Sequence, residues 1–166
     1  MIIAGVDEVG RGCLAGPVVA AVVILENSIT GLNDSKKISK KKREVLYDEI
    51  LENATSVAVG VKWNDYIDKH NIKVASEHAM IDAINLLNVK PNKVLIDGFS
   101  LDIDIENEGI IKGDQKSLSI AAASILAKAC SNASTVFPCL FAFPAYVWYC
   151  DWNSLNSFSY KFHIHC

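Results

Sequence analysis

The chain has 166 residues, of which 51% are hydrophobic and 21% charged, and its formal net charge is −3. This length and composition fit one folded domain with a buried core and exclude a disordered chain. The net charge excludes a surface that is basic overall, although it allows a local basic patch. Because no apolar run has transmembrane length and the N-terminus lacks the basic start of a signal peptide, we expect a cytoplasmic protein.

The first part of the chain predicts two strands and a helix. Residues 1–7 have the pattern of a strand, and residues 17–25 form a continuous apolar run that is typical of a central strand covered on both faces. Ser39 is placed to cap a helix that runs to about Asn53, and the run from Lys40 to Arg43 fills its first turns. Cations there oppose the helix dipole. We interpret them as a solvated helix face, with contact to a nucleic acid as the alternative.

The middle of the chain predicts alternating strands and helices. The expected strands are 55–62, 93–98 and 110–111, and the expected helices are 64–69, 72–88 and 117–128. The last of these helices is rich in small residues, which would let it lie close against a neighbour. Three early strands followed by helix–strand alternation predict an α/β fold with a mixed sheet and helices on its faces.

The character of the sequence changes at about Ala129. Residues 129–166 hold ten of the 14 aromatic residues but only two charged side chains, Asp151 and Lys161. Neither a helical nor a strand period persists there. Four of the five cysteines also lie in this part, at spacings that fit no zinc motif. No linker precedes it, so we do not expect a second domain.

Four carboxylates lie where an α/β sheet would bring strand ends to one edge, a place where ligands commonly bind. They are Asp7, Glu8, Asp97 and Asp114. Unpaired carboxylates repel one another, and divalent cations relieve that repulsion. Hard oxygen ligands favour Mg²⁺ or Mn²⁺, and two such ions about 4 Å apart can promote phosphodiester hydrolysis. The alternative is that Asp97-Gly98 and Gly113-Asp114 are ordinary turns.

A glycine-rich turn, Gly10-Arg11-Gly12, follows the first two carboxylates. Glycines without Cβ atoms allow the backbone to approach a ligand closely. Arg11 offers a planar donor fork that suits a phosphate. The acidic pair and this turn together indicate metal-dependent chemistry on a phosphate-bearing polymer.

The ordered set of motifs resembles type 2 ribonuclease H (ribonuclease HII) over residues 2–128. The resemblance implies an RNase H-like mixed sheet with helices on both faces, followed by an atypical C-terminal part. The segments that carry it are Asp7 to Gly12, Leu14 to Ala21, Asp34 to Ser39, Asn71-Ile72 with Ala75, Leu95 to Gly98, Lys112 to Asp114 and Ser119 to Lys128.

This resemblance implies an endonuclease that hydrolyses the RNA strand of RNA–DNA hybrids, or cuts 5′ of ribonucleotides in duplex DNA, by two-metal-ion catalysis with Mg²⁺ or Mn²⁺. The four carboxylates named above match the metal-binding catalytic residues of the family. The turn formed by Gly10, Arg11 and Gly12 would read the 2′-hydroxyl, which distinguishes RNA from DNA. We expect a monomer with no membrane partner.

Further contacts with the nucleic acid are implied for residues outside the turn. For Asn71 a helix cap is an equal alternative. The implied contacts are Ser35, Lys36, Lys37, Asn71, Lys112 and Lys116.

The motifs end at Lys128. The family continues with a segment that contains an Arg-Asp pair and, later, a Gly-Tyr segment whose tyrosine packs against the sugar at the RNA–DNA junction, and neither occurs here. We therefore expect residues 1–128 to form the catalytic domain and residues 129–166 to be a divergent or frameshifted tail.

Two alternatives stay open at this point. One is a catalytically impaired nucleic-acid-binding remnant with a scrambled C-terminus. The other is an integrase-like enzyme with the same fold and the same two-metal chemistry. The glycine-rich turn argues against the second alternative, because an enzyme that acts only on DNA has no need to read a 2′-hydroxyl.

Overall fold

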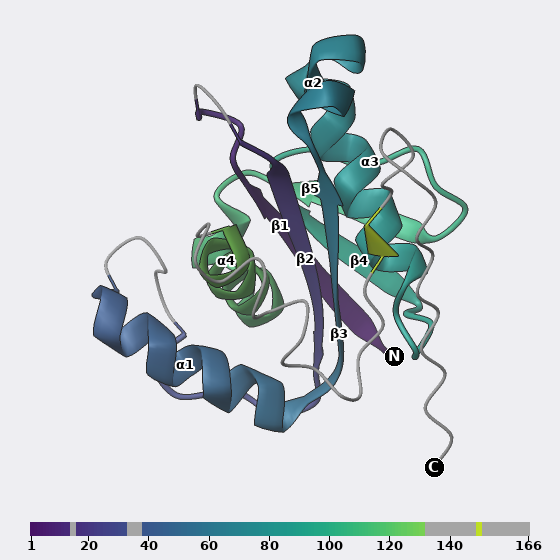
Figure 1. Cartoon of the computed structure of the whole chain (residues 1–166). Coiled ribbons are helices and arrows are strands. Elements are labelled where there is room, and N and C mark those ends of the chain that lie inside the picture. Colours follow the sequence, from purple (N-terminus) through teal and green to yellow (C-terminus); the bar gives the residue numbers. More distant parts are fainter. Residues whose placement is uncertain (14–15, 33–37, 132–148, 151–166) are drawn as a thin grey trace.

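One mixed sheet forms the centre of the molecule (Figure 1). The computed structural model describes residues 1–13, 16–32 and 38–131 and the backbone of 149–150. The strand order is β5-β4-β1-β2-β3-β6. The first three strands are antiparallel in succession, β4 and β5 continue parallel to β1, and β6 pairs parallel to β3. The bounds are β1 Ile3–Val9, β2 Val18–Leu25, β3 Ala54–Lys62, β4 Lys93–Asp97, β5 Glu106–Ile110 and β6 Tyr149–Cys150.

Helices cover both faces of this sheet, as Figure 1 shows, so the predicted α/β architecture is confirmed. α1 (Lys40–Asn53) and α4 (Leu118–Ser131) lie on one face. α3 (Ile72–Asn85) lies on the other face, with the short α2 (Asn64–His70) beside it. A 3₁₀ turn, η1 (Gly113–Gln115), leads into α4. None of the helices in the described ranges has the length and hydropathy needed to cross a membrane.

The second strand is the most buried element because both of its faces are covered. Side chains of its odd-numbered residues pack into the core beneath α1 and α4, and those of its even-numbered residues pack beneath α3. Every residue from Val18 to Val23 is fully buried. Burying one such valine contributes about 1.5–3 kcal/mol. The apolar run in the sequence therefore predicted this strand correctly.

The small residues of α4 let the helix lie directly on β1. A Cβ added to Gly5 would lie 2.2 Å from the carbonyl carbon of Ser119, so only glycine fits beneath the start of the helix. Ala121, Ala122 and Ala123 are buried in the same core. This close packing fixes the position of α4 relative to the strand that carries Asp7 and Glu8.

Most predicted elements agree with the structure to within about two residues. α1 begins after Ser39, whose hydroxyl accepts a hydrogen bond from the backbone N–H of Lys42 at 3.3 Å, as predicted. The third helix is shorter than predicted. The N–H of Leu86 is shared between the carbonyl oxygens four and three residues back, at 3.1 and 3.2 Å, and the N–H of Leu87 bonds only three residues back among the described residues, so the backbone tightens there.

The predicted strand at residues 110–111 was misplaced. The strand instead begins at Glu106, pairs with β4 and lies at the end of the strand order of the described sheet. Its charged residues gave no apolar pattern because they lie on an edge, where Lys93 on β4 forms ion pairs with Glu106 and Glu108 at 3.2 and 3.0 Å. Expectations for residues 14–15, 33–37, 132–148 and 151–166 fall outside the described residues.

Candidate active site

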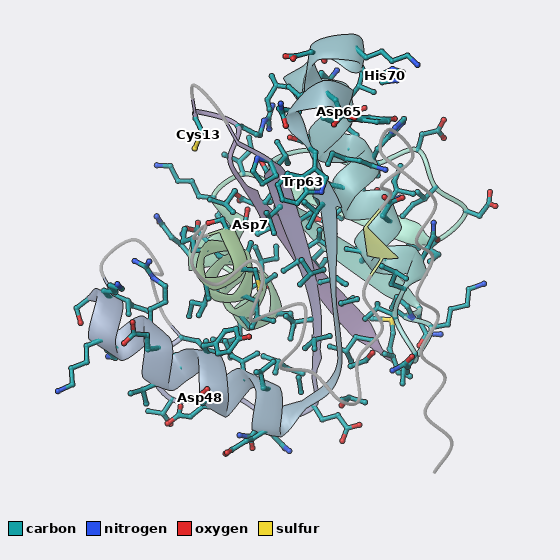
Figure 2. All side chains as sticks on the ribbon, in the orientation of Figure 1. Asp7, Cys13, Asp48, Trp63, Asp65 and His70 are labelled. Atoms are coloured by element: carbon teal, nitrogen blue, oxygen red, sulfur yellow. The ribbon has the colours of Figure 1, made fainter. Side chains whose placement is uncertain are left out.

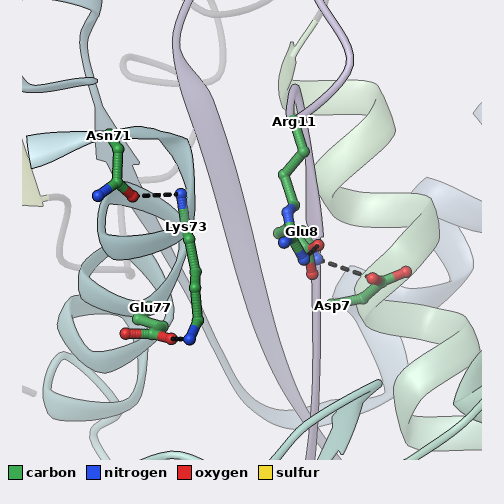
Figure 3. A network of polar contacts seen from close by, with 6 residues as sticks. All are labelled: Asp7, Glu8, Arg11, Asn71, Lys73 and Glu77. Carbon is green, nitrogen blue, oxygen red and sulfur yellow. Dashed lines mark hydrogen bonds and ion pairs between the residues drawn. The ribbon is translucent and has the colours of Figure 1, made fainter. Parts of the chain in front are cut away.

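Asp7 lies near the end of β1 on the face that α4 covers. It pairs in register with Ala21, and its side chain is buried. Its Oδ1 accepts a hydrogen bond from the backbone N–H of Glu8 at 2.8 Å (Figure 3), and the hydroxyl of Ser124 on α4 also bonds its carboxyl group. Burial raises the pKa of Asp7 to about 7, and the negative charges of Glu8 and Asp97 act in the same direction. A cation bound nearby would therefore stabilise the charged form of the Asp7 carboxyl group.

Glu8 is the second carboxylate of the pair. Its Oε1 lies 3.2 Å from Nη1 of Arg11. Its Oε2 is buried and makes no hydrogen bond with any residue that the structure describes. Burial raises the pKa of Glu8, the charge of Asp97 adds to this rise, and the guanidinium of Arg11 opposes it. A buried, unbonded carboxylate oxygen is a suitable metal ligand.

Asp97 ends β4, the parallel neighbour of β1. Its Oδ1 accepts a hydrogen bond from the backbone N–H of Gly113 at 2.6 Å. A Cβ added to Gly113 would lie 2.6 Å from Cδ1 of Ile120 and 3.3 Å from Oδ1 of Asp97, so the glycine permits this approach. Asp114 follows directly in η1 and is 2% exposed. The hydrogen bond to Gly113 thus ties the end of β4 to the turn that carries the fourth carboxylate.

The structure brings Asp7, Glu8 and Asp97 within electrostatic reach of one another, with Asp114 in the adjoining turn. Among the described residues, no three His, Cys, Asp or Glu side chains already have the arrangement of a metal site. Mg²⁺ commonly takes one or two carboxylates and completes its shell with water and phosphate oxygens. The donor set, all hard oxygen and with one buried oxygen unbonded, therefore fits such an ion.

The glycine-rich turn follows β1 directly and lies next to these carboxylates. Gly10 has a φ of 108°, and an added Cβ would lie 2.4 Å from the carbonyl oxygen of Pro17, so this position requires glycine. Among the residues that the structure describes, none would lie within 4 Å of a Cβ added to Gly12. The Arg11 side chain is 41% exposed, and its guanidinium lies 5.7 Å from the centre of the Phe99 ring. Gly10 is therefore required for the backbone conformation of the turn, whereas Gly12 leaves open space beside the turn.

Strand register places this turn at the same end of the sheet as the start of α2. Val18 pairs with Lys62, which is the residue directly before Trp63, and Val9 pairs with Val19. Figure 2 shows Asp7 between the sheet and α4, with Cys13 of the turn and Trp63 toward the same end. The start of α2 therefore lies at this end of the sheet, and the start of α3 follows α2 in the chain after one residue.

Asn71 lies at that start and caps α3. Its Oδ1 accepts a hydrogen bond from the backbone N–H of Lys73 at 3.0 Å (Figure 3) and another from the backbone N–H of Val74 at 3.1 Å. The cap interpretation of the sequence is therefore confirmed. The cap uses the amide oxygen and leaves the donor side of the exposed amide directed elsewhere.

The predicted basic contacts have different outcomes. Lys112 and Lys116 are exposed at the two ends of η1, beside Asp114. Lys40, Lys41 and Lys42 are exposed on α1, as expected of a solvated helix face, whereas Arg43 of the same run is half-buried. The remaining predicted contacts, Ser35, Lys36 and Lys37, lie outside the described residues.

Two polar residues near Asp7 received no role from the sequence. Ser124 and Lys128 lie one turn apart on α4, and Ser124 contacts Asp7. Their four-residue spacing in an otherwise apolar and small-residue helix was the available signal. The sequence alone could not show that this face of α4 lies over Asp7.

Comparisons with known proteins give a consistent result. A statistical model of the family described as ribonuclease HII matches residues 4–137, past the last motif at Lys128. Ribonuclease HII of Thermotoga maritima is 54% identical over 127 residues, which are 76% of this chain and 53% of that protein. Ribonuclease HII of Lactobacillus acidophilus is 54% identical over 129 residues, which are 76% of this chain and 52% of that protein.

A solved structure shares the fold. The crystal structure of ribonuclease H2 from Pyrococcus horikoshii is similar with a TM-score of 0.72 and 26% identity, over 84% of this chain and 75% of that one. The chain spans about half the length of the curated relatives it matches.

Proposed function

The chain belongs to the ribonuclease HII family and has an RNase H-like fold, and from this premise we propose that it is a metal-dependent endoribonuclease. It would hydrolyse the RNA strand of RNA–DNA hybrids or cut 5′ of ribonucleotides in duplex DNA. The observation that carries the proposal is the mutual approach of Asp7, Glu8 and Asp97 at one sheet edge, with Asp114 in the turn bonded to Asp97.

We propose that these four carboxylates hold Mg²⁺ or Mn²⁺. When bound, a pair of such ions activates water and stabilises the leaving oxygen of a phosphodiester. The protein contributes position: the N–H of Glu8 fixes one oxygen of Asp7, and the N–H of Gly113 fixes one oxygen of Asp97. Because the carboxylates are partly desolvated before any ligand arrives, their charges are poorly screened and attract a cation strongly.

Recognition of RNA is assigned to the glycine-rich turn. The open space beside Gly12 would admit a sugar to the backbone, where peptide groups can bond a 2′-hydroxyl. Arg11 would donate to a phosphate once it leaves Glu8. Lys112 and Lys116 flank Asp114 and would contact the backbone of the nucleic acid, as would Asn71 through its amide donor.

Three residues of the proposed interface rest on the family resemblance alone. Ser35, Lys36 and Lys37 belong to its second motif. We also propose that residues 1–128 are the catalytic domain, that residues 129–166 are an atypical tail, and that the protein acts as a monomer in the cytoplasm. Light scattering tests whether the protein is a monomer, and cell fractionation tests whether it lies in the cytoplasm.

A second candidate function is binding without efficient cleavage. The observation that favours it is the loss of the family's Arg-Asp and Gly-Tyr segments after Lys128. A single assay separates the candidates: a labelled RNA–DNA hybrid, a duplex with one ribonucleotide and an all-DNA duplex are each incubated with the protein in Mg²⁺ and in Mn²⁺. Cleavage restricted to the ribonucleotide-containing substrates supports the endoribonuclease, and binding without cleavage supports the remnant. Equal cleavage of the all-DNA duplex would favour the integrase-like enzyme.

A further inference from the structure

Two residues of α4 form a polar chain that ends on Asp7. Nζ of Lys128 donates a hydrogen bond to Oγ of Ser124 at 2.8 Å, and Ser124 in turn bonds the carboxyl group of Asp7. Ser124 is 1% exposed, so water does not compete for its hydroxyl. Such a chain in a helix otherwise built from small and apolar residues needs an explanation, because burying polar groups is costly unless they are bonded.

The chemistry of the three groups fixes the direction of the chain. An ammonium group can only donate hydrogen bonds, whereas a serine hydroxyl has one proton to give and lone pairs to accept. A carboxylate oxygen can only accept, so the bond between Ser124 and Asp7 uses the serine proton, while Ser124 accepts from Lys128. The carboxyl group of Asp7 is thereby an acceptor from Ser124, and the positive charge of Lys128 polarises the hydroxyl further.

The bond from Ser124 adds a second constraint on the orientation of the Asp7 carboxyl group. Its Oδ1 already accepts from the backbone N–H of Glu8 on its own strand. The bond from Ser124 comes from α4, an element far away in sequence that Gly5 allows to lie directly on β1. Two donors from two elements hold the plane of one carboxyl group, which a bond from a single element would leave free to rotate.

We propose that Ser124 and Lys128 are positioning residues: they orient the Asp7 carboxylate toward a bound Mg²⁺ or Mn²⁺ ion. The inference rests on the proposed function, since it assumes that Asp7 is a metal ligand. Groups that bond a metal ligand from outside the coordination shell commonly change metal affinity by 10–100-fold when they are removed.

The test measures the affinity of the full chain for Mn²⁺ alone, from the electron paramagnetic resonance signal of the free ion. Ser124→Ala should weaken Mn²⁺ binding roughly tenfold. Ser76→Ala is the matched control, because Ser76 is equally buried in α3 on the other face of the sheet and its hydroxyl bonds no described residue. This control should bind Mn²⁺ as the unmodified chain does, and thermal unfolding in EDTA shows whether both variants fold.

Lys128 gives an independent comparison that does not depend on the folding of Ser124→Ala. Lys128→Met should weaken Mn²⁺ binding several-fold, and Lys128→Arg, which keeps a cationic donor, should restore part of it. Mn²⁺ affinities that are unchanged in both Ser124→Ala and Lys128→Met, in a chain whose binding depends on Asp97, would overturn this inference alone. An unmodified chain that binds no Mn²⁺ would overturn the proposed function and this inference together.

Discussion

Oε1 of Glu8 and Nη1 of Arg11 lie 3.2 Å apart across the turn that leaves β1. Glu8 is a proposed metal ligand, and Arg11 is a proposed phosphate contact. The ion pair therefore joins the two halves of the candidate site. In the free protein the guanidinium partly offsets the charge that a divalent ion would otherwise neutralise, and it also lies 5.7 Å from the centre of the Phe99 ring.

Arg11→Ala should weaken the binding of an RNA–DNA hybrid with little loss of stability. The Arg11 side chain is 41% exposed, so the ion pair contributes less than about 1 kcal/mol. Binding of a fluorescent hybrid in Ca²⁺ and thermal unfolding in EDTA measure the two effects separately. A melting temperature that falls by many degrees, with unchanged hybrid affinity, would contradict the assignment of Arg11 to the substrate.

Asp97→Asn should abolish cleavage of the hybrid while leaving its binding largely intact. Asparagine keeps an Oδ1 that can accept the hydrogen bond from Gly113, so the turn should keep its position, whereas the charge needed for a metal ion is lost. Asp102→Asn, the same substitution at an exposed position, is the control and should cleave normally. Full cleavage by Asp97→Asn in Mg²⁺ would refute the proposed metal site.

The pKa of Asp7 predicts how stability depends on pH without metal. The pKa is about 7 in the folded protein and 3.8 for the unperturbed group, so the folded state binds the extra proton between these values. Stability in EDTA should therefore fall as the pH rises from about 4 to 7, by at most about 4 kcal/mol for a shift of this size. Glu8, whose pKa is also raised, acts in the same direction.

Denaturant unfolding of the unmodified chain and of Asp7→Asn, across this pH range in EDTA, measures the effect. Asp7→Asn has no proton to lose, so its stability should fall less steeply and should exceed that of the unmodified chain at pH 8. Added Mn²⁺ should stabilise the unmodified chain more at pH 8 than at pH 6. Parallel curves for the two proteins would show that Asp7 is not the titrating group.

The two glycines of the turn should respond differently to substitution. Gly12→Val should keep the stability of the fold, because a Cβ there meets no atom of the described part of the chain within 4 Å, but it should cut hybrid cleavage sharply by holding the chain away from the sugar. Gly10→Ala should destabilise the protein itself, because its φ is 108° and the carbonyl oxygen of Pro17 lies where a Cβ would be. Unfolding curves and cleavage rates for both variants make the comparison. Normal cleavage by Gly12→Val would remove the turn from substrate recognition.

The sequence predicted the elements whose burial is complete and missed features that depend on contacts between distant elements. The apolar run of β2 and the small residues of α4 reflect their covered positions directly, so both elements were placed well. β5 was misplaced because an edge strand tolerates charged residues such as Glu106 and Glu108. The bond between Ser124 and Asp7 joins residues 117 positions apart, and only the packing of α4 on Gly5 reveals it.

The change of composition at Ala129, in the last turn of α4, predicts a shifted reading frame. Out-of-frame codons would lose the charged residues, the apolar period and the family's Arg-Asp and Gly-Tyr segments together, which is what residues 129–166 show. The match to the family continues to residue 137, so the shift is expected between codons 128 and 137. Resequencing this interval, and translating all three frames beyond it, should reveal both missing segments in another frame.

Restoring that frame should raise both solubility and the rate of hybrid cleavage. The present tail carries ten aromatic residues and two charged ones, a composition that favours association when such side chains are exposed. It also lacks the tyrosine that the family places against the sugar at the junction, so the unrestored chain should cleave weakly. Light scattering and cleavage rates of the two proteins, at equal concentration, give the comparison. If no other frame encodes the missing segments and the present chain is monodisperse and cleaves the hybrid as fast as its relatives do, then residues 129–166 are a working, divergent C-terminus.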